Sequence, residues 1–408
     1  MTVDTRLRIK SRKSHRLTVR YILGVLFVFF STLPWVSFGT NKLDTQPWFI
    51  ILGLLFVVSV AKFPVRRNVC FIFLIPVALV LTLILSGFYV DFLLDRAIVS
   101  YMAFVLVLFG FYVYVMRYGF PWKIIIFSNI IWLFVAVLQM RYGKMIFDFL
   151  VSARTSAPRG VTSLAVEPTY FGLFLLFISW MYLIAGNYKL PFRIWLLVIL
   201  NSVFMVFFSR SSTAVLFLVV GICFFVIGSF SVRSSVGLLL ALVISLLSVH
   251  YAVRLVPGTR LFSLYKKVFS MRVVELAYID ESINERLADV IFPIHGFFIN
   301  YGLPGGFHSY SLMRSELISV YGGYFWGSGT DNRIMSFLGA FMYELGLFAA
   351  VFFVGLFLML WDGTKKRFAE LAFFFILLNS AISVAFPLVA MIISMWFYKK
   401  NSARSITT

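Results

Sequence analysis

Long apolar runs, separated by short polar or basic connections, make up most of the chain. A helix needs about 20 predominantly apolar residues to cross the ~30 Å hydrocarbon core of a bilayer, so each run of that length predicts one crossing. A last apolar block, 369–398, is long for one crossing and short for two, and Ser380, Ser383 and Pro387 are candidate break points. The pattern predicts an all-α polytopic integral membrane protein. The other crossings are expected at 19–39, 47–63, 69–89, 97–116, 122–140, 166–186, 192–208, 212–230, 235–253 and 334–361.

Basic residues orient this series of helices. If the N-terminus is cytoplasmic, every short loop on that side carries lysine or arginine, as the positive-inside rule requires. A basic tail, 399–408, would also prefer the cytoplasm, which favours splitting the last block into a tight hairpin and about 12 transmembrane helices in all, with 11 as the alternative. The clusters are Arg6 to Arg20, Lys62 with Arg66 and Arg67, Arg117 with Lys123, Lys189 with Arg193, Arg233, Lys365 to Arg367, and the tail residues Lys399, Lys400 and Arg404.

Composition supports the same class. Of 408 residues, 61% are hydrophobic and 13% are charged, and the mean hydropathy of +0.96 lies far outside the range of soluble domains. The 36 lysines and arginines outnumber the 16 acidic residues, but they lie in connections, where they suit anionic lipids or substrates rather than a nucleic acid. Cys70 and Cys223 fall inside apolar runs, where packing is expected instead of a disulfide or a metal site.

The resulting organisation places two long connections opposite the basic loops. We expect a basic cytoplasmic N-terminus over 1–18, leading into an uncleaved first anchor, then nine helices over 19–253 interrupted by a connection at 141–165. A large loop, 254–333, precedes the last helices at 334–398. This loop contains two predicted short amphipathic helices, LFSLYKKVFSMRVVELAYI and NERLADVIFPIHGFF, and a tight turn at GLPGG.

Candidate functional residues gather at the same side as these two connections. Several converging arginines suit a diphosphate, because a guanidinium group binds phosphate oxygens in a bidentate way that a lysine cannot. A lipid-linked sugar diphosphate is the natural candidate ligand. The residues are Arg154, Arg159 and Glu167 before the sixth run, Arg210 in SRSS, Arg286, His295 and His308 in the large loop, and Asp331, Asn332 and Arg333 at its end.

Some of these residues also have structural interpretations. Arg210, in a turn of a few residues, needs an anion or carboxylate nearby unless it simply reaches the membrane interface. Glu167 precedes Pro168, a good helix start where a carboxylate is favourable, and this role is compatible with a catalytic one. His295 and His308 could act as bases or could merely be hydrogen-bonded.

Four segments, taken in order, resemble a known family. They are RGVTSLAVEPTYFG, SRSSTAVLFLVVG, the arginine of SINERLADVIF followed by a glycine-rich turn, and DNRIMSFLGAFMYELGLFAAV. Each is weak alone, but their order and topology are similar to those of the O-antigen polymerase and O-antigen ligase superfamily over about 150–350.

The resemblance implies a multi-span, lipid-phosphate-sugar-dependent glycosyltransferase in the bacterial inner membrane, with its active site facing the periplasm. The donor would be a glycan on polyprenyl (undecaprenyl) diphosphate, transferred with inversion and without a nucleotide, metal or other cofactor. By position, Arg159 and Arg210 would hold the leaving diphosphate and Arg286 would reach the donor or acceptor glycan. Membrane lipids and a polysaccharide chain-length regulator are candidate partners.

The general base and the exact reaction stay open. The ligase branch carries a histidine just before the helix that ends the large loop, whereas this chain has Gly329 to Arg333 there. This departure favours a polymerase of repeat units over a ligase that transfers glycan to lipid A core. The base is open among Glu167, Asp331 and His308, and Glu167 is preferred because it shares a motif with Arg159. A lipid-glycan flippase or transporter is the alternative of a different class, although the sequence has no evident internal repeat.

Overall fold

The computed structural model describes residues 19–37, 45–60, 67–86, 92–155, 159–229, 275, 278–327, 334–379 and 382–407. Every regular element in these ranges is helical, in agreement with the all-α prediction. Five of the described helices are long and apolar enough to cross a membrane, and four shorter apolar helices accompany them. The predicted run 235–253 and nearly all of the predicted helix 261–279 lie outside the described residues.

In the first half of the chain, the described helices begin within about five residues of the predicted starts, but the first helix ends at Ser31, eight residues before the predicted end at 39. The helices here are α1 (Val19–Ser31), α2 (Trp48–Ser59), the 3₁₀ turn η1 (Arg67–Phe73) continuing into α3 (Leu74–Ser86), α4 (Phe92–Tyr118), α5 (Trp122–Tyr142), α6 (Pro168–Ala185), α7 (Phe192–Phe204), the π-helical turn η2 (Met205–Ser209) and α8 (Ser212–Ser229). The second half contains α12 (Glu281–Ile299), α13 (Tyr310–Val320), α14 (Phe337–Leu345), α15 (Leu347–Leu360), α16 (Lys365–Leu378) and α17 (Pro387–Thr407).

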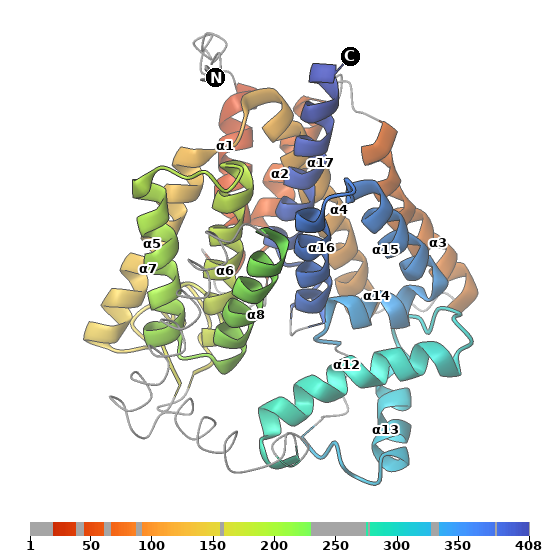
Figure 1. Ribbon diagram of the computed structural model, residues 1–408. Helices are drawn as coiled ribbons and strands as arrows, with labels where there is room; N and C mark the ends of the chain where they lie inside the picture. Colours follow the sequence, from red (N-terminus) through yellow and green to blue (C-terminus); the bar gives the residue numbers. More distant parts are fainter. Residues whose placement is uncertain are drawn as a thin grey trace.

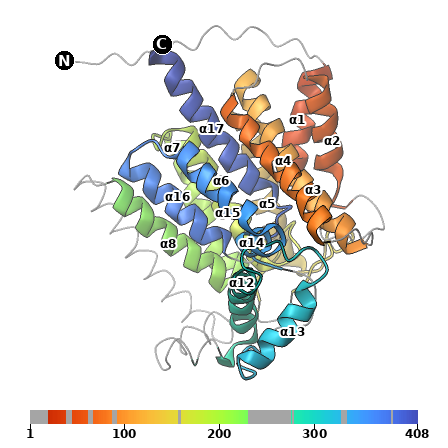
Figure 2. The same ribbon diagram turned by 90° about the vertical axis from the view of Figure 1, so that its right-hand side faces the viewer.

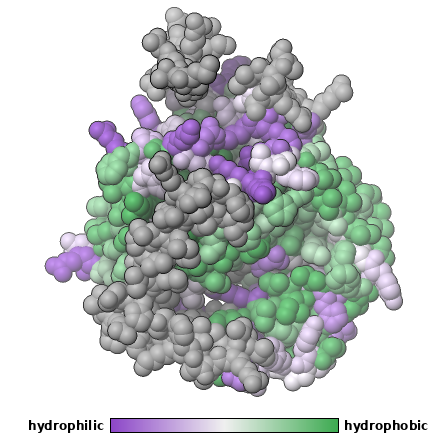
Figure 3. Space-filling view, viewed as in Figure 1, coloured by the Kyte–Doolittle hydropathy of each residue, from purple (hydrophilic) through white to green (hydrophobic). Residues whose placement is uncertain are grey.

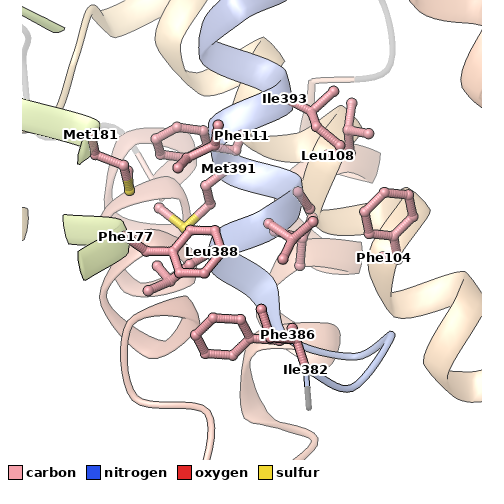
Figure 4. Packing of buried hydrophobic residues seen from close by; sticks show 14 of the residues in the cluster. Phe104, Leu108, Phe111, Phe177, Met181, Ile382, Phe386, Leu388, Met391 and Ile393 are labelled. Carbon is pink, nitrogen blue, oxygen red and sulfur yellow. The ribbon is translucent and has the colours of Figure 1, made fainter. Parts of the chain in front are cut away.

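Helix α6 forms the centre of the bundle. Nearly all of its side chains are buried, and it packs against α5, α7, α8 and α17. The last helix, α17, also lies along α4, and α16 lies along α8, so the C-terminal helices close a core begun by the first half of the chain (Figure 1). The side chains that interdigitate here, shown in Figure 4, include Leu388, Met391 and Ile393 of α17, Phe104, Leu108 and Phe111 of α4, and Phe177 and Met181 of α6.

The outside of the bundle is apolar. Large hydrophobic side chains are exposed on α2, α3, α5 and α7, for example Leu54, Leu85, Phe134 and Ile199. Figure 3 shows apolar side chains over the flank of the molecule and hydrophilic ones gathered at the end where α17 terminates. Exposed apolar surface of this extent is the mark of a protein embedded in a membrane.

The predicted span 334–361 is not one helix. It is divided at Gly346, whose φ of 58° ends α14 and begins α15. The GLPGG turn docks against this break, because the Leu347 N–H donates to the Gly302 carbonyl at 2.8 Å and the Gly305 N–H donates to the Tyr343 carbonyl at 2.8 Å. A Cβ at Gly346 would lie 2.4 Å from the Gly302 oxygen, so only glycine fits.

The block 369–398 does divide into two helices. The first, α16, ends at Leu378, and α17 begins at Pro387, close to the predicted break points. The two cysteines are free thiols. Cys70 is exposed on η1, contrary to the packing role predicted for it, and Cys223 is half-buried on α8.

The described part of the large loop, 278–327, forms a small layer of its own at one end of the bundle (Figures 1 and 2). The predicted helix NERLADVIFPIHGFF is the greater part of α12, which starts at the cap Asp280 and packs against α13 and α14. A separate core holds these helices together, and its buried members are Ala288, Phe292, Tyr310, Met313, Leu317, Phe325 and Tyr343.

Candidate anion-binding site

The segment before α6 is folded into the bundle rather than lying over it. Val161 to Val166 are all buried. The Gln139 side chain of α5 pairs with Ser163 in both directions, accepting from its N–H at 2.6 Å and donating to its carbonyl at 3.1 Å. The Ser163 hydroxyl donates to the Trp132 carbonyl at 2.6 Å. These bonds fix the backbone that leads from Arg159 to the start of α6.

Gly160 brings this segment against η2, the π-helical turn that follows α7. The Val161 N–H donates to the Phe208 carbonyl at 2.9 Å. A Cβ at Gly160 would lie 2.1 Å from the Ser209 carbonyl oxygen and 2.2 Å from that of Phe208, so any other residue would push the two backbones apart. The glycine therefore places Arg159 next to the turn that carries Arg210.

That turn has an unusual backbone. Helix α7 widens into the π-helical turn η2, and Arg210 follows in the left-handed conformation, with φ 47° and ψ 29°. Its Nε donates to the Phe207 carbonyl at 3.2 Å. A residue other than glycine in this region stores about 1–3 kcal/mol of strain, and π-helical turns and such strain are concentrated at functional sites.

Arg286 reaches the same place from the large loop. It projects from α12 and donates to the hydroxyls of Thr213, in the first turn of α8, and Thr169, in the first turn of α6, the second at 3.1 Å. The Ser211 hydroxyl also donates to Thr169 at 3.1 Å. A network of hydroxyls therefore links the loop arginine to both helix starts.

These groups line one hollow, which we call the arginine pocket. It encloses about 360 Å³, including its open mouth. The residues around it are Arg159, Pro168, Thr169, Ser209, Arg210, Ser211, Ser212 and Arg286.

The pocket is electropositive for two reasons. Its lining, as far as the structure describes it, contains three guanidinium groups and no carboxylate. The N-termini of α6 and α8 also open into it, and helix N-termini attract anions through their unpaired N–H groups and dipoles. Burial and the Arg210 charge lower the pKa of Lys144, which donates to the Arg159 carbonyl. An anion with several oxygens is the ligand that this arrangement suits.

The other predicted site residues that the structure describes do not line this pocket. Glu167 is the half-buried N-terminal residue before α6, directly preceding Pro168, and its side chain does not cap the helix. Arg154 is exposed, and its N–H donates to the Val166 carbonyl at 2.6 Å. Neither side chain is part of the described pocket lining. Asp331, Asn332 and Arg333 lie outside the described residues.

The two histidines belong to the loop layer. His295 follows Arg286 by nine residues on α12, about 13 Å along the axis, and its Nδ1 is 3.0 Å from the Tyr321 hydroxyl. His308 is half-buried just before α13. Neither is among the residues that line the arginine pocket in the described part of the chain.

Sequence reasoning missed the hydroxyls of Thr169 and Thr213, which accept from Arg286. It also missed Lys144, which donates to the Arg159 carbonyl. Thr169 lies in EPTYFG and Thr213 in SRSST, each beside a charged residue of the predicted site. A hydroxyl in the first turn of a helix next to such a residue is a sequence signal that could have identified both threonines as site residues. Glu344 of α14 accepts from the Tyr101 hydroxyl of α4, a contact between these two helices.

Comparisons with known proteins identify no relative. No family model matches the chain, and neither a curated protein nor a solved structure matches it. Among the described residues, no three His, Cys, Asp or Glu side chains come together as ligands for a metal ion.

Proposed function

We propose that the chain is a polysaccharide repeat-unit polymerase that joins polyprenyl-diphosphate-linked oligosaccharides at the periplasmic face of the bacterial inner membrane. The observation that carries the proposal is the arginine pocket. Three arginines from separate segments converge there, on the starts of two membrane-embedded helices. The motif resemblance supplies the reaction class, and the basic loops supply the orientation.

The diphosphate of the donor would occupy the pocket. Arg159 and Arg210 would bind its oxygens, while Arg286 would reach them or the first sugar from the loop side. Exposed apolar side chains on the neighbouring helices, such as Val203 and Leu216, would border the polyprenyl chain. The sugar would then lie between the pocket and α12.

The transfer is a substitution at the anomeric carbon. An acceptor hydroxyl attacks this carbon, the bond to the diphosphate oxygen breaks, and the polyprenyl diphosphate leaves with the electron pair and inversion at the carbon. Negative charge grows on the leaving oxygen, where preorganised guanidinium groups lower the barrier most. The acceptor proton needs a base within hydrogen-bond reach, and Glu167 is the described carboxylate that adjoins the pocket lining.

The experiment is a reaction of the purified protein in liposomes with polyprenyl-diphosphate-linked repeat units from its host, without nucleotide or added metal. A ladder of products spaced by one repeat unit is the expected result. With intact substrate and no ladder, the polymerase proposal fails. Transfer to an added lipid A core acceptor would then indicate a ligase, and movement of the lipid-linked glycan across the liposome would indicate a flippase.

A further inference from the structure

A second charged hollow lies at the other end of α6. It is lined in part by Asn187 and Tyr188, which follow α6, by Lys366 and Arg367 of α16, and by Lys399 of α17, and it encloses about 540 Å³ including its mouth. We call it the lysine cavity. Because α6 has 18 residues, the arginine pocket and the lysine cavity are about 27 Å apart along its axis. That is close to the thickness of the hydrocarbon core of a membrane.

A strained turn builds one wall of the cavity. Asn187 and Tyr188 both have left-handed backbones, with φ values of 53° and 62°. The Tyr188 N–H donates back to the Leu183 carbonyl at 2.9 Å. This geometry places the Tyr188 ring under the ammonium group of Lys366, which lies 3.3 Å from the ring centroid, and the Tyr188 hydroxyl donates to Glu370.

The two carboxylates of the cavity are both engaged by its arginine. Arg367 lies 2.6 Å from Glu370 and 3.7 Å from Asp362. The lysines contact neutral groups: Lys366 lies on the Tyr188 ring, and Lys399 donates to the Asn187 side-chain oxygen. Three cations therefore share two carboxylates, and two ammonium groups retain the capacity to bind an anion.

Electrostatics agree with this geometry. Lys399 lies beyond the apolar part of α17, and burial and the neighbouring Arg367 charge lower its pKa to about 8. The positive charge of the lysine is therefore disfavoured in the cavity as it stands, and an anion would relieve the repulsion.

The surroundings point to a lipid as the source of that anion. Trp361, which follows α15, and Phe368 of α16 are the sequence neighbours of the lining residues Asp362 and Arg367. They are 43% and 54% exposed, and both rings pack on Phe357. Exposed aromatic side chains at the end of apolar helices are typical of the membrane interface. The three segments that meet here carry basic residues that the sequence places on the cytoplasmic side, where anionic lipids are found.

We propose that the lysine cavity binds the phosphate of an anionic phospholipid of the cytoplasmic leaflet. Lys366 and Lys399 contact the phosphate, and the acyl chains run beside Trp361 and Phe368. The bound lipid joins the end of α6 to α16 and α17, three segments far apart in the sequence. This site does not depend on the proposed polymerase reaction.

The test measures lipid binding to the full-length protein in neutral detergent by native mass spectrometry and by thermal unfolding. Phosphatidylglycerol is titrated against phosphatidylcholine and inorganic phosphate. We expect phosphatidylglycerol to bind and stabilise the protein, phosphatidylcholine to do neither, and the Lys366→Gln/Lys399→Gln variant to bind phosphatidylglycerol about tenfold more weakly or worse. Stabilisation by inorganic phosphate equal to that by phosphatidylglycerol would overturn the lipid assignment.

Three control variants keep the test decisive. Lys189→Gln removes an exposed lysine of the same connection that does not line the cavity, and it should bind phosphatidylglycerol normally. Lys366→Arg/Lys399→Arg retains both charges and should bind lipid even if the glutamine variant folds poorly. Arg210→Gln removes a charge from the arginine pocket and leaves the lysine cavity unchanged, so phosphatidylglycerol binding that is lost in this variant is binding at the arginine pocket. Unchanged binding in the folded double glutamine variant, or equal losses in Lys189→Gln, would refute the proposal.

Discussion

The two ends of α6 hold their cations in different ways. In the arginine pocket, guanidinium groups rest on hydroxyls and carbonyls, and the backbone that carries them is tightly constrained at Gly160 and Arg210. In the lysine cavity, the arginine is neutralised by carboxylates and the lysines rest on neutral groups. The arginine pocket is therefore preorganised for an anion whose oxygens have fixed positions. The lysine cavity can accept a phosphate at a range of angles.

This difference follows from the chemistry of the two side chains. A guanidinium group is planar and presents its donors in a rigid fork, while an ammonium group is a compact point charge on a flexible stem. A reaction that builds charge on a leaving diphosphate gains most from the rigid fork. Retention of a lipid headgroup needs only net positive charge and an apolar border.

The largest expected effect tests the rigid fork. Arg210→Lys keeps the charge but loses the bidentate geometry and the bond from Nε to the Phe207 carbonyl. We expect polymerisation in the liposome assay to fall by about 10²-fold or more, as for the loss of one preorganised donor. Arg193→Lys, at an exposed site on α7, is the matched control. Full activity of Arg210→Lys would mean that Arg210 acts only as a positive charge that helps to set membrane topology, and not as a ligand of the diphosphate.

Glu167→Gln tests the base beside the same pocket. The change preserves shape and removes the proton acceptor, so lipid-linked substrate should still bind while turnover falls by about 10²-fold. Since the Glu167 side chain does not cap α6, the thermal unfolding midpoint should hardly move. Unchanged turnover would transfer the role of base to Asp331 or His308.

Gly160→Ala tests whether the constrained backbone matters. The added Cβ would meet the carbonyl oxygens of Phe208 and Ser209 at 2.1–2.2 Å, so the segment must move away and carry Arg159 with it. We expect about a tenfold loss of activity and a destabilisation of about 1–3 kcal/mol, read by thermal unfolding. Gly110→Ala is the control, because its Cβ would meet Phe27 side-chain carbons at 3.1 Å. Equal effects of the two variants would contradict the special role of Gly160.

The two ends also differ in how far the sequence predicts them. Helices α5 and α6 match their predicted runs within about two residues, since apolar length alone determines them. Arg159, Arg210 and Arg286 were expected at one face, and the structure brings them together at one pocket. The contacts of Arg286 with Thr169 and Thr213 depend on the docking of α12, which periodicity does not encode.

The lysine cavity and the break at Gly346 were not predicted. Lys366 and Lys399 were interpreted only as orienting charges, because the turn at Asn187 and Tyr188 that gives them neutral partners is a tertiary feature. Gly346 lies inside a run that is apolar throughout, and it breaks the helix only where the Gly302 backbone docks. Both errors arise from contacts between segments far apart in the sequence.

The smallest expected effect is a pH dependence confined to the lysine cavity. The pKa of Lys399 is lowered to about 8 by burial and by Arg367, opposed by Glu370 and reinforced by Lys366. A bound phosphate favours the protonated lysine, so affinity for phosphatidylglycerol should be full well below pH 8, begin to fall near pH 8 and be several-fold lower by about pH 9.5. Lys399→Arg should flatten this profile, since an arginine stays charged throughout the range. If the profile is as steep in Lys399→Arg as in the native chain, the titrating group is Lys366 or another residue, and the two lysines do not share the phosphate in the way proposed.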